Sequence, residues 1–401
     1  MAGYRELLRT PGVARIIAAQ LTARLPNGMT SLALLLHIEY VTGSYGAAGL
    51  VLAATSVGQA IAGPVTSRWM GRWGMRRVLL LTLAVCVAAI ATIAAFTLPL
   101  PAYIALGLVA GLATPPVQPA VRTIYPKLVN SRQVTPLYSL DASLQEVIWI
   151  VAPVLITFVA TQVGTVPALG MIVVVMIVGG LWFIFSPEVA RVRIPRSRRS
   201  FGKVLAKPSV ILATAVGFLL IGACSAVEAG VVASFGHDGP EAGIVLAVFA
   251  VGSLSGGLAF GHLPIGPWAM ARRMAIVTAG LVLAVLSLNV WWLGGTLFLA
   301  GIGIAPALAV VFSMTSASVK FSETAEAYGW IGTGQLIGAA AGSAVAGFLI
   351  DGVGPQGALG SGLLFALAGT VVAVVFVRSF PDLRHRDASP IPDTEPVDTV
   401  T

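Results

Sequence analysis

Four ionisable side chains lie inside long apolar runs of the chain, where they could carry a proton or bind a charged ligand: Arg24, Asp141, Glu146 and Glu228. In hydrocarbon, such a side chain costs about 2.5 to 3.5 kcal/mol, so each must be paired, hydrated or functional. Proton relays and substrate sites are the chemistry that residues of this kind perform in membranes. These four residues are therefore the first candidates for function.

Arg24 and Glu146 match in depth when their runs are read as helices. Arg24 lies roughly 16 Å into its run and Glu146 roughly 14 Å into its own, and both runs begin on the same side. The pair could be a charge pair or a proton-switched carboxylate near a substrate cavity. It could equally be a buried ion pair that fixes helix packing.

Glu228 and Asp141 have different surroundings. Glu228 lies in "LLIGACSAVEAGVVASF" with no Lys or Arg nearby at its depth, which makes it a second proton-coupling candidate or a carboxylate that reaches an outer vestibule. Asp141 is expected one turn into its helix. The helix dipole favours a carboxylate there, so capping or interface salt bridging is the preferred interpretation over substrate binding.

Uncharged polar residues accompany proline in two of the runs. "TARLPNGMTS" predicts a helix break at Pro26 to Gly28, after which Gln20 and Asn27 could face substrate. "ATPPVQPAV" holds three prolines around Gln118, and Pro306 interrupts a later run. Such breaks favour bending and gating.

Composition places the chain in a membrane. Hydrophobic residues make up 57% of 401, charged residues 10%, and the mean hydropathy is +0.92, which is typical of a polytopic membrane protein. The net charge of +8 comes from loop residues and so indicates no nucleic-acid partner. The two cysteines and four scattered histidines form no disulfide framework, metal site or catalytic set, so we expect no enzyme, metal, cofactor or ATP drive.

Twelve segments are long enough to span a bilayer. Their expected ranges are 13–39, 46–67, 78–98, 102–124, 137–161, 167–186, 209–235, 241–261, 274–293, 295–319, 327–350 and 358–378. With both termini in the cytoplasm, 23 of the 24 Lys and Arg fall in or beside cytoplasmic segments, the exception being Arg24. This distribution is a strong positive-inside signal, and we expect a multi-pass protein of the plasma membrane.

The chain divides into two sets of six helices, residues 1–186 and 209–378. A basic segment, 187–208, reads as a cytoplasmic linker between them, and residues 379–401 read as a disordered cytoplasmic tail. An internal repeat supports the division: "AGLATPP" matches "AGIGIAP", and "LYSLDASLQ" matches "AYGWIGTGQ", both at an offset of 190 residues. The offset pairs Pro116 with Pro306, Tyr138 with Tyr328, and Gln145 with Gln335.

The loop between the second and third spans, "GPVTSRWMGRWGMRRVLL", resembles the signature loop of the major facilitator superfamily. The residues that fit are Gly63, Pro64, Arg68, Arg72, Trp73, Gly74, Arg76 and Arg77. The resemblance implies an all-α membrane protein of two pseudo-symmetric six-helix bundles, with a binding site near the midplane between them. It extends over essentially all of the helical chain.

The resemblance also implies how the cavity is lined. If spans one, four, seven and ten line it, they offer mostly Ala, Val and Leu together with Phe312 and Met314, which suits a lipophilic or amphipathic ligand. We therefore expect a monomeric, proton-gradient-driven exporter of such a small molecule. An uptake symporter or facilitator for a small metabolite, and a transporter-like receptor or scaffold without turnover, are the alternatives.

Three features depart from the resembled efflux proteins. Gly71 replaces the usual Asp of the loop, no Arg precedes Arg122 in span four, and the Gly-Pro signature of span five is reduced to Ala152 and Pro153. The loop would latch the two halves together on the cytoplasmic side. We expect Glu323 and Glu326, just before span eleven, to supply the acid that Gly71 lacks by pairing with Arg72 or Arg76.

Small residues recur every fourth position in spans two, eight and eleven. Such ladders let helix backbones approach closely, and the resemblance places these helices along the seam between the halves. The residues are Ala54, Gly58 and Ala62, then Gly252 and Gly256, then Gly334, Gly338, Gly342 and Ala346.

Overall fold

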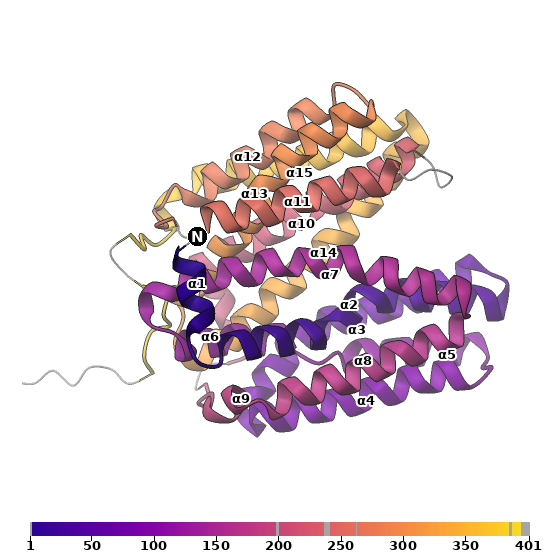
Figure 1. Ribbon diagram of the computed structural model, residues 1–401, viewed down its shortest axis with the longest axis horizontal. Helices are drawn as coiled ribbons and strands as arrows, with labels where there is room; N and C mark the ends of the chain where they lie inside the picture. The colour runs from indigo at the N-terminus through magenta and orange to yellow at the C-terminus, as the bar shows by residue number, and fades with distance from the viewer. Residues whose placement is uncertain (1, 198–199, 236–240, 262, 385–386, 394–401) are drawn as a thin grey trace, which may run out of the picture.

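The computed structural model describes all residues except 1, 198–199, 236–240, 262, 385–386 and 394–401 (Figure 1). Its long helices are α2 (Val13–Thr42), α3 (Tyr45–Trp73), α4 (Met75–Ala95), α5 (Leu100–Leu112), α6 (Val117–Leu128), α7 (Ser131–Gln162), α8 (Thr165–Phe185), α10 (Pro208–Phe235), α11 (Glu241–Phe260), α12 (Ala269–Ala284), α13 (Val290–Ser318), α14 (Phe321–Val353) and α15 (Pro355–Val375). Short helical pieces are α1 (Ala2–Arg9), α9 (Pro187–Arg191), η1 (Lys203–Ala206) and η2 (Val377–Ser379).

The helices form two bundles that lie side by side (Figure 1). We call α2–α8 the N-half and α10–α15 the C-half. Within the N-half α2 packs on α7 and α8 and α3 on α5; within the C-half α10 packs on α14 and α15 and α11 on α13. The halves meet where α3 contacts α14 and where α7 contacts α11 and α13. The side of the molecule that carries α1, α9 and the linker is called the linker side below.

Ten helices of the described part of the chain are long and apolar enough to cross a membrane, with α5 and α6 counted together. The two remaining predicted spans are α2, which is 30 residues long but carries several polar side chains, and α12, which has only 16 residues. The predicted boundary between spans nine and ten was wrong. The turn lies at 285–289, where the Asn289 side chain accepts hydrogen bonds from the N–H groups of Trp291 (3.0 Å) and Trp292 (3.3 Å) and so caps α13.

One of the predicted breaks is confirmed and another is wrong. Span four breaks at residues 113–116 into α5 and α6, because Pro115 and Pro116 cannot continue the hydrogen-bond ladder. In contrast, α2 runs unbroken through Pro26. There the hydroxyl of Thr30 donates to the Pro26 carbonyl (2.7 Å), so the turn at the proline remains hydrogen-bonded.

The small-residue ladders let helices approach closely, but inside the halves rather than along the seam. A Cβ at Gly342 would lie 2.1 Å from the Gly222 carbonyl of α10, and one at Gly256 would lie 2.1 Å from the Ile302 carbonyl of α13. Gly58 likewise packs on the backbone of α5. These glycines therefore hold each bundle together, while the helices that carry them, α3, α11 and α14, do meet the opposite half as predicted.

The segment expected as a disordered tail packs against the C-half over its described residues. Leu383 N–H donates to Ile265 (2.8 Å), and Ile391 exchanges backbone hydrogen bonds with Val319 and Phe321 at 2.9 and 3.0 Å. The Asp393 carboxylate accepts from the backbone N–H and hydroxyl of Ser322, in the first turn of α14. Apolar burial of Phe380 and Leu383 offsets the entropy of ordering this segment.

Candidate functional site

The two halves touch closely on the linker side. The Ser139 hydroxyl of α7 donates to the Gly257 carbonyl of α11 (2.8 Å), and the Thr333 hydroxyl of α14 donates to the Ala60 carbonyl of α3 (2.7 Å). Glycine permits both approaches: a Cβ at Gly261 would lie 1.7 Å from Ser139 Oγ, and one at Gly329 would lie 2.5 Å from the Gly63 carbonyl. The structure is therefore closed on this side.

Helix α1, which precedes the first span, adds to this closure. Leu7 is fully buried and anchors the helix, and the Tyr4 hydroxyl donates to the same Gly257 carbonyl (3.0 Å). Burial is the largest influence on Tyr4 and raises the pKa of its hydroxyl. Tyr4 therefore stays a neutral hydrogen-bond donor between the halves.

The signature loop contributes an ion pair across the seam. Arg68 of α3 pairs with Glu326 of α14 at 2.5 Å, and Glu326 also accepts from the Gly202 N–H of the linker (2.8 Å). Glu323 pairs with Lys207 of the linker (2.9 Å). Glu326 thus supplies a carboxylate to the arginine loop, but it pairs with Arg68 and not with the expected Arg72 or Arg76.

The other loop residues serve the turn and the loop's own half. Gly74 has a φ of +90°, a conformation that a side chain would strain, and it joins α3 to α4. Arg76 donates to the Ile184 carbonyl of α8 (3.1 Å), while Arg72 and Arg77 are exposed. A Cβ at Gly71 would meet the Pro195 carbonyl of the linker at 3.2 Å, so the linker backbone covers the position where the resembled loop has Asp.

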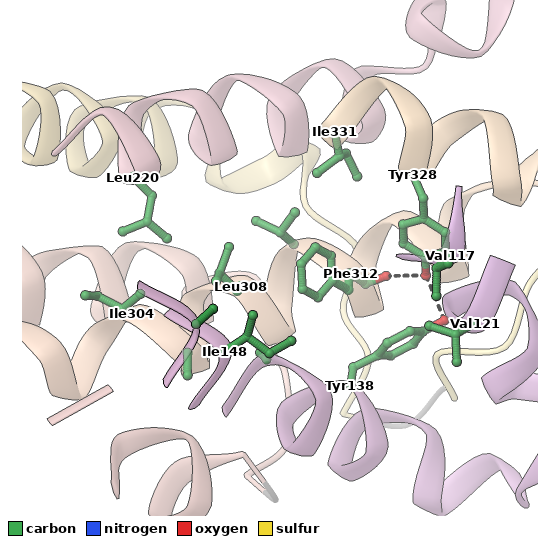
Figure 2. Packing of buried hydrophobic residues seen from close by; sticks show 14 of the residues in the cluster. Val117, Val121, Tyr138, Ile148, Leu220, Ile304, Leu308, Phe312, Tyr328 and Ile331 are labelled. Atoms are coloured by element: carbon green, nitrogen blue, oxygen red, sulfur yellow. Dashed lines mark hydrogen bonds between the residues drawn. The ribbon is translucent and has the colours of Figure 1, made fainter. Parts of the chain in front are cut away.

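A tyrosine pair lies at the centre of the seam (Figure 2). Tyr138 of α7 and Tyr328 of α14, which the repeat offset matches, are joined by a hydroxyl–hydroxyl bond of 2.7 Å. The Tyr138 hydroxyl also donates to the Arg122 carbonyl (3.0 Å), and the Tyr328 hydroxyl lies 3.1 Å from the Phe312 carbonyl. Buried apolar side chains of both halves lie beside the pair, including Val117, Val121 and Phe312 (Figure 2).

Beside the tyrosines lies a charged cluster built by α2, α6 and α7 of the N-half. The fully buried carboxylate of Asp141 accepts four hydrogen bonds: at Oδ1 from Gln20 (3.2 Å), Arg24 (3.0 Å) and Tyr125 (3.1 Å), and at Oδ2 from Arg122 (3.0 Å). Arg24 therefore pairs with Asp141, not with Glu146. Helix α7 begins at Ser131, six residues before the predicted start, so Asp141 lies deep in the helix and caps nothing.

Two glutamines complete the cluster. Gln145 Oε1 accepts from a guanidinium nitrogen of Arg24 and from Arg122 (3.3 Å). With its own oxygen turned toward Arg122, the Gln118 amide accepts from both terminal nitrogens of that guanidinium, at 2.8 and 2.7 Å. The face of Arg122 stacks on the Phe312 ring of the C-half, 3.4 Å from the ring centre.

Glu146 and Glu228 belong to different halves but interact electrostatically. Glu146 of α7 interacts with the Ser253 hydroxyl of α11 and lies close enough to Glu228 of α10 for the two carboxylates to repel. Ser253 is itself held by the Ala305 N–H of α13 (3.2 Å). The Glu228 side chain is exposed. The structure thus brings together the two carboxylates that the sequence nominated separately.

The remaining candidates lie apart from these groups, and the sequence reading missed several members. Asn27 is exposed and lines a small cavity between α2 and α4 with Pro115, whereas Met314 is buried in α13. The sequence pattern does not predict Tyr125 or the ring of Phe312 as members of the cluster. It predicts Arg122 at the inner end of its span. In the described residues no three His, Cys, Asp or Glu side chains gather as metal ligands would.

The family comparison covers both halves. The model of the Major Facilitator Superfamily matches residues 16–233 and 224–398. The search of curated proteins finds no match.

Solved structures of transporters share the fold. A bacterial homologue of the iron transporter ferroportin in an outward-facing state gives a TM-score of 0.74 at 14% identity, over 91% of this chain and 98% of that one. The human organic anion transporter MFSD10 (TETRAN) gives 0.70 at 15% identity over 90% and 100%. The E. coli fucose:proton symporter FucP gives 0.69 at 15% over 90% and 98%. At these identities the likeness concerns the fold alone.

Proposed function

Because this chain belongs to the Major Facilitator Superfamily, a family of membrane transporters and not of enzymes, we propose that it is a proton-coupled secondary transporter that exports a lipophilic or amphipathic small molecule by alternating access. The energy source would be a proton gradient across the plasma membrane, with the linker side in the cytoplasm and the monomer as the working unit. The bilayer and the substrate are then its only necessary partners.

The observation that carries the proposal is the pair of Glu146 and Glu228. Two carboxylates that are close enough to interact repel each other, and binding of one proton relieves the repulsion. They belong to different halves, so their separation changes when the halves rock. Proton affinity would therefore depend on conformation, which is what coupling requires.

The seam supports the lipophilic class of substrate. The surfaces that the two halves bring together around Tyr138 and Tyr328 are largely aliphatic and aromatic (Figure 2). When the halves separate on the linker side, these surfaces would be uncovered to the cytoplasm. An apolar molecule entering there would bury its own surface at about 25 cal/mol per Å².

The experiment is proton-linked flux in proteoliposomes with an imposed pH gradient. A pH-sensitive dye inside the vesicles reports proton movement when lipophilic dyes are added as test substrates. We expect Glu146→Gln to abolish coupled flux while the purified variant keeps its elution profile and helical content. Glu228→Gln should reduce coupling, and Glu241→Gln, at the start of α11, is the matched control. Full coupling in Glu146→Gln would refute the assignment.

The alternatives have distinct signatures in the same vesicles. An uptake symporter would move substrate and protons in the same direction, and a facilitator would move substrate without protons. A receptor or scaffold would show binding without flux under any gradient. The direction of substrate movement relative to protons therefore decides among them.

A further inference from the structure

The cluster around Asp141 carries more positive than negative charge. Arg24 and Arg122 contribute two guanidinium groups, which stay protonated in proteins, and Asp141 contributes one carboxylate. All three side chains are at most 4% exposed. A net positive charge in such a site is costly, so the site attracts an anion whenever one can reach it.

Gln145 marks the place where an anion would bind. Its amide oxygen lies where Arg24 and Arg122 converge and takes a hydrogen bond from each. A carboxylate or phosphate oxygen at the same point would make the same bonds with charge assistance, which roughly doubles their strength. Gln145 is neutral and only half-buried, so it can swing aside where Asp141 cannot.

The cover over this point comes from the opposite half. Phe312 of α13 lies on the face of Arg122, and Tyr328 holds Tyr138 beside it. Asp141 and its partners all belong to the N-half, so the cluster stays intact when the halves part on the linker side. That movement would withdraw Phe312 and expose the guanidinium face.

We propose that the point occupied by the Gln145 amide oxygen binds the anionic group of the transported molecule, entering from the linker side, while the apolar body of that molecule lies on the seam residues. The inference rests on the proposed function in one respect, that the bound molecule is transported. It adds a substrate class, amphipathic anions with a carboxylate or phosphate ester. Inorganic anions share the charged group but have no apolar body to bury.

The test is a thermal-shift measurement on the purified full-length protein in detergent, with matched acid and neutral ligands. The pairs are 2-naphthylacetate with 2-naphthylacetamide, and 2-naphthyl phosphate with 2-naphthol; acetate and inorganic phosphate serve as anions without an apolar body. The Glu326→Gln background, which removes the ion pair with Arg68, frees the linker side. We expect the aromatic anions to stabilise the protein more than their neutral partners, with the larger shift in that background.

Variants at Gln145 distinguish an effect on anion binding from an effect on protein stability. Gln145→Glu places a carboxylate between the arginines, so we expect a higher melting temperature without ligand and an apparent affinity for the aromatic anions lowered about tenfold or more. Gln145→Ala vacates the point and should raise that affinity. Gln335→Glu, at the matched position of the C-half, is the control and should leave anion binding unchanged.

The outcomes are separable from those of the transport experiment. Equal stabilisation by acid and neutral ligands, or by acetate and 2-naphthylacetate, would overturn the anion site. So would a lower melting temperature in Gln145→Glu, because the cluster would then have no excess positive charge. Anion binding with intact coupled flux supports both proposals; anion binding without flux supports only the site, and coupled flux without anion binding supports only the transporter.

Discussion

The two halves differ most where the repeat predicts that they should be alike. At the offset of 190 residues, Arg122 of the N-half corresponds to Phe312 of the C-half, and Asp141 corresponds to Ile331. The N-half thus holds buried charge where the C-half holds apolar side chains. Corresponding residues also meet: Arg122 stacks on Phe312, and Tyr138 bonds to Tyr328.

This asymmetry shows which contacts can survive a cycle of opening. Asp141 accepts four hydrogen bonds from helices of its own half, and removing one partner of a buried ion pair costs about 3 to 5 kcal/mol. The contacts across the seam are mostly neutral hydrogen bonds, each contributing about 0.5 to 1.5 kcal/mol. Apart from the Arg68–Glu326 ion pair across the seam, the costly interactions therefore stay within one half, and the weaker ones break when the halves separate.

The largest expected effect on stability comes from removing the buried carboxylate of the N-half. Asp141→Asn leaves Arg24 and Arg122 buried together without a counter-charge, so we expect about 3 to 5 kcal/mol of destabilisation. Ile331→Val, at the matched position, should cost about 1 kcal/mol. Denaturant unfolding in mixed micelles measures both. Equal losses at the two positions would mean that the halves do not differ in this way.

The same cluster shows how far the sequence could predict the site. Hydropathy and charge indicated the two bundles, and the cost of burying charge singled out Arg24, Asp141, Glu146 and Glu228. The sequence could not predict which of these side chains form ion pairs, because that depends on where each helix begins. The early start of α7 moves Asp141 to the depth of Arg24.

Arg122 is a second residue whose burial the sequence could not predict. At the end of a predicted span it looks like an ordinary interfacial arginine, since arginines anchor helix ends by extending toward water. The break between α5 and α6 lets α6 begin anew at Val117 and directs Arg122 inward. The prolines signalled the break, but the direction of α6 after it depends on packing against α7 and α14, which no local pattern records.

Glycine-to-alanine substitutions should separate the seam from the interior of a half. Gly329→Ala places a Cβ against the Gly63 backbone of the opposite half, so we expect the linker side to open with little loss of stability. Gly342→Ala makes a comparable clash with Gly222 inside the C-half and should instead lower stability by about 3 kcal/mol. Spin-label distances between introduced cysteines at Arg77 and Trp268, one exposed site in each half, would measure the opening. An unchanged distance in Gly329→Ala would show that the seam tolerates the added methyl group.

Charge reversal at the ion pair across the seam should have an intermediate effect. Glu326→Arg opposes Arg68 and should shift the population toward the state that is open on the linker side by about tenfold, or about 1.4 kcal/mol. The double variant with Arg68→Glu restores the opposite charges and should restore the distance between the same labels. Rescue by Arg72→Glu instead would indicate that Arg72, not Arg68, is the operative partner.

The smallest expected effect comes from the tyrosine pair, where the two halves are most alike. Tyr328→Phe removes one hydroxyl from the seam and should open the linker side by about 1 kcal/mol, the net contribution of one neutral hydrogen bond. Tyr138→Phe removes the same bond, and each hydroxyl also lies near a backbone carbonyl of its own half, Tyr138 near that of Arg122 and Tyr328 near that of Phe312. The two variants should therefore open the linker side equally and lose similar stability, as measured by the label distance and by denaturant unfolding. A clearly larger loss in one of the two variants would contradict this equivalence of the halves.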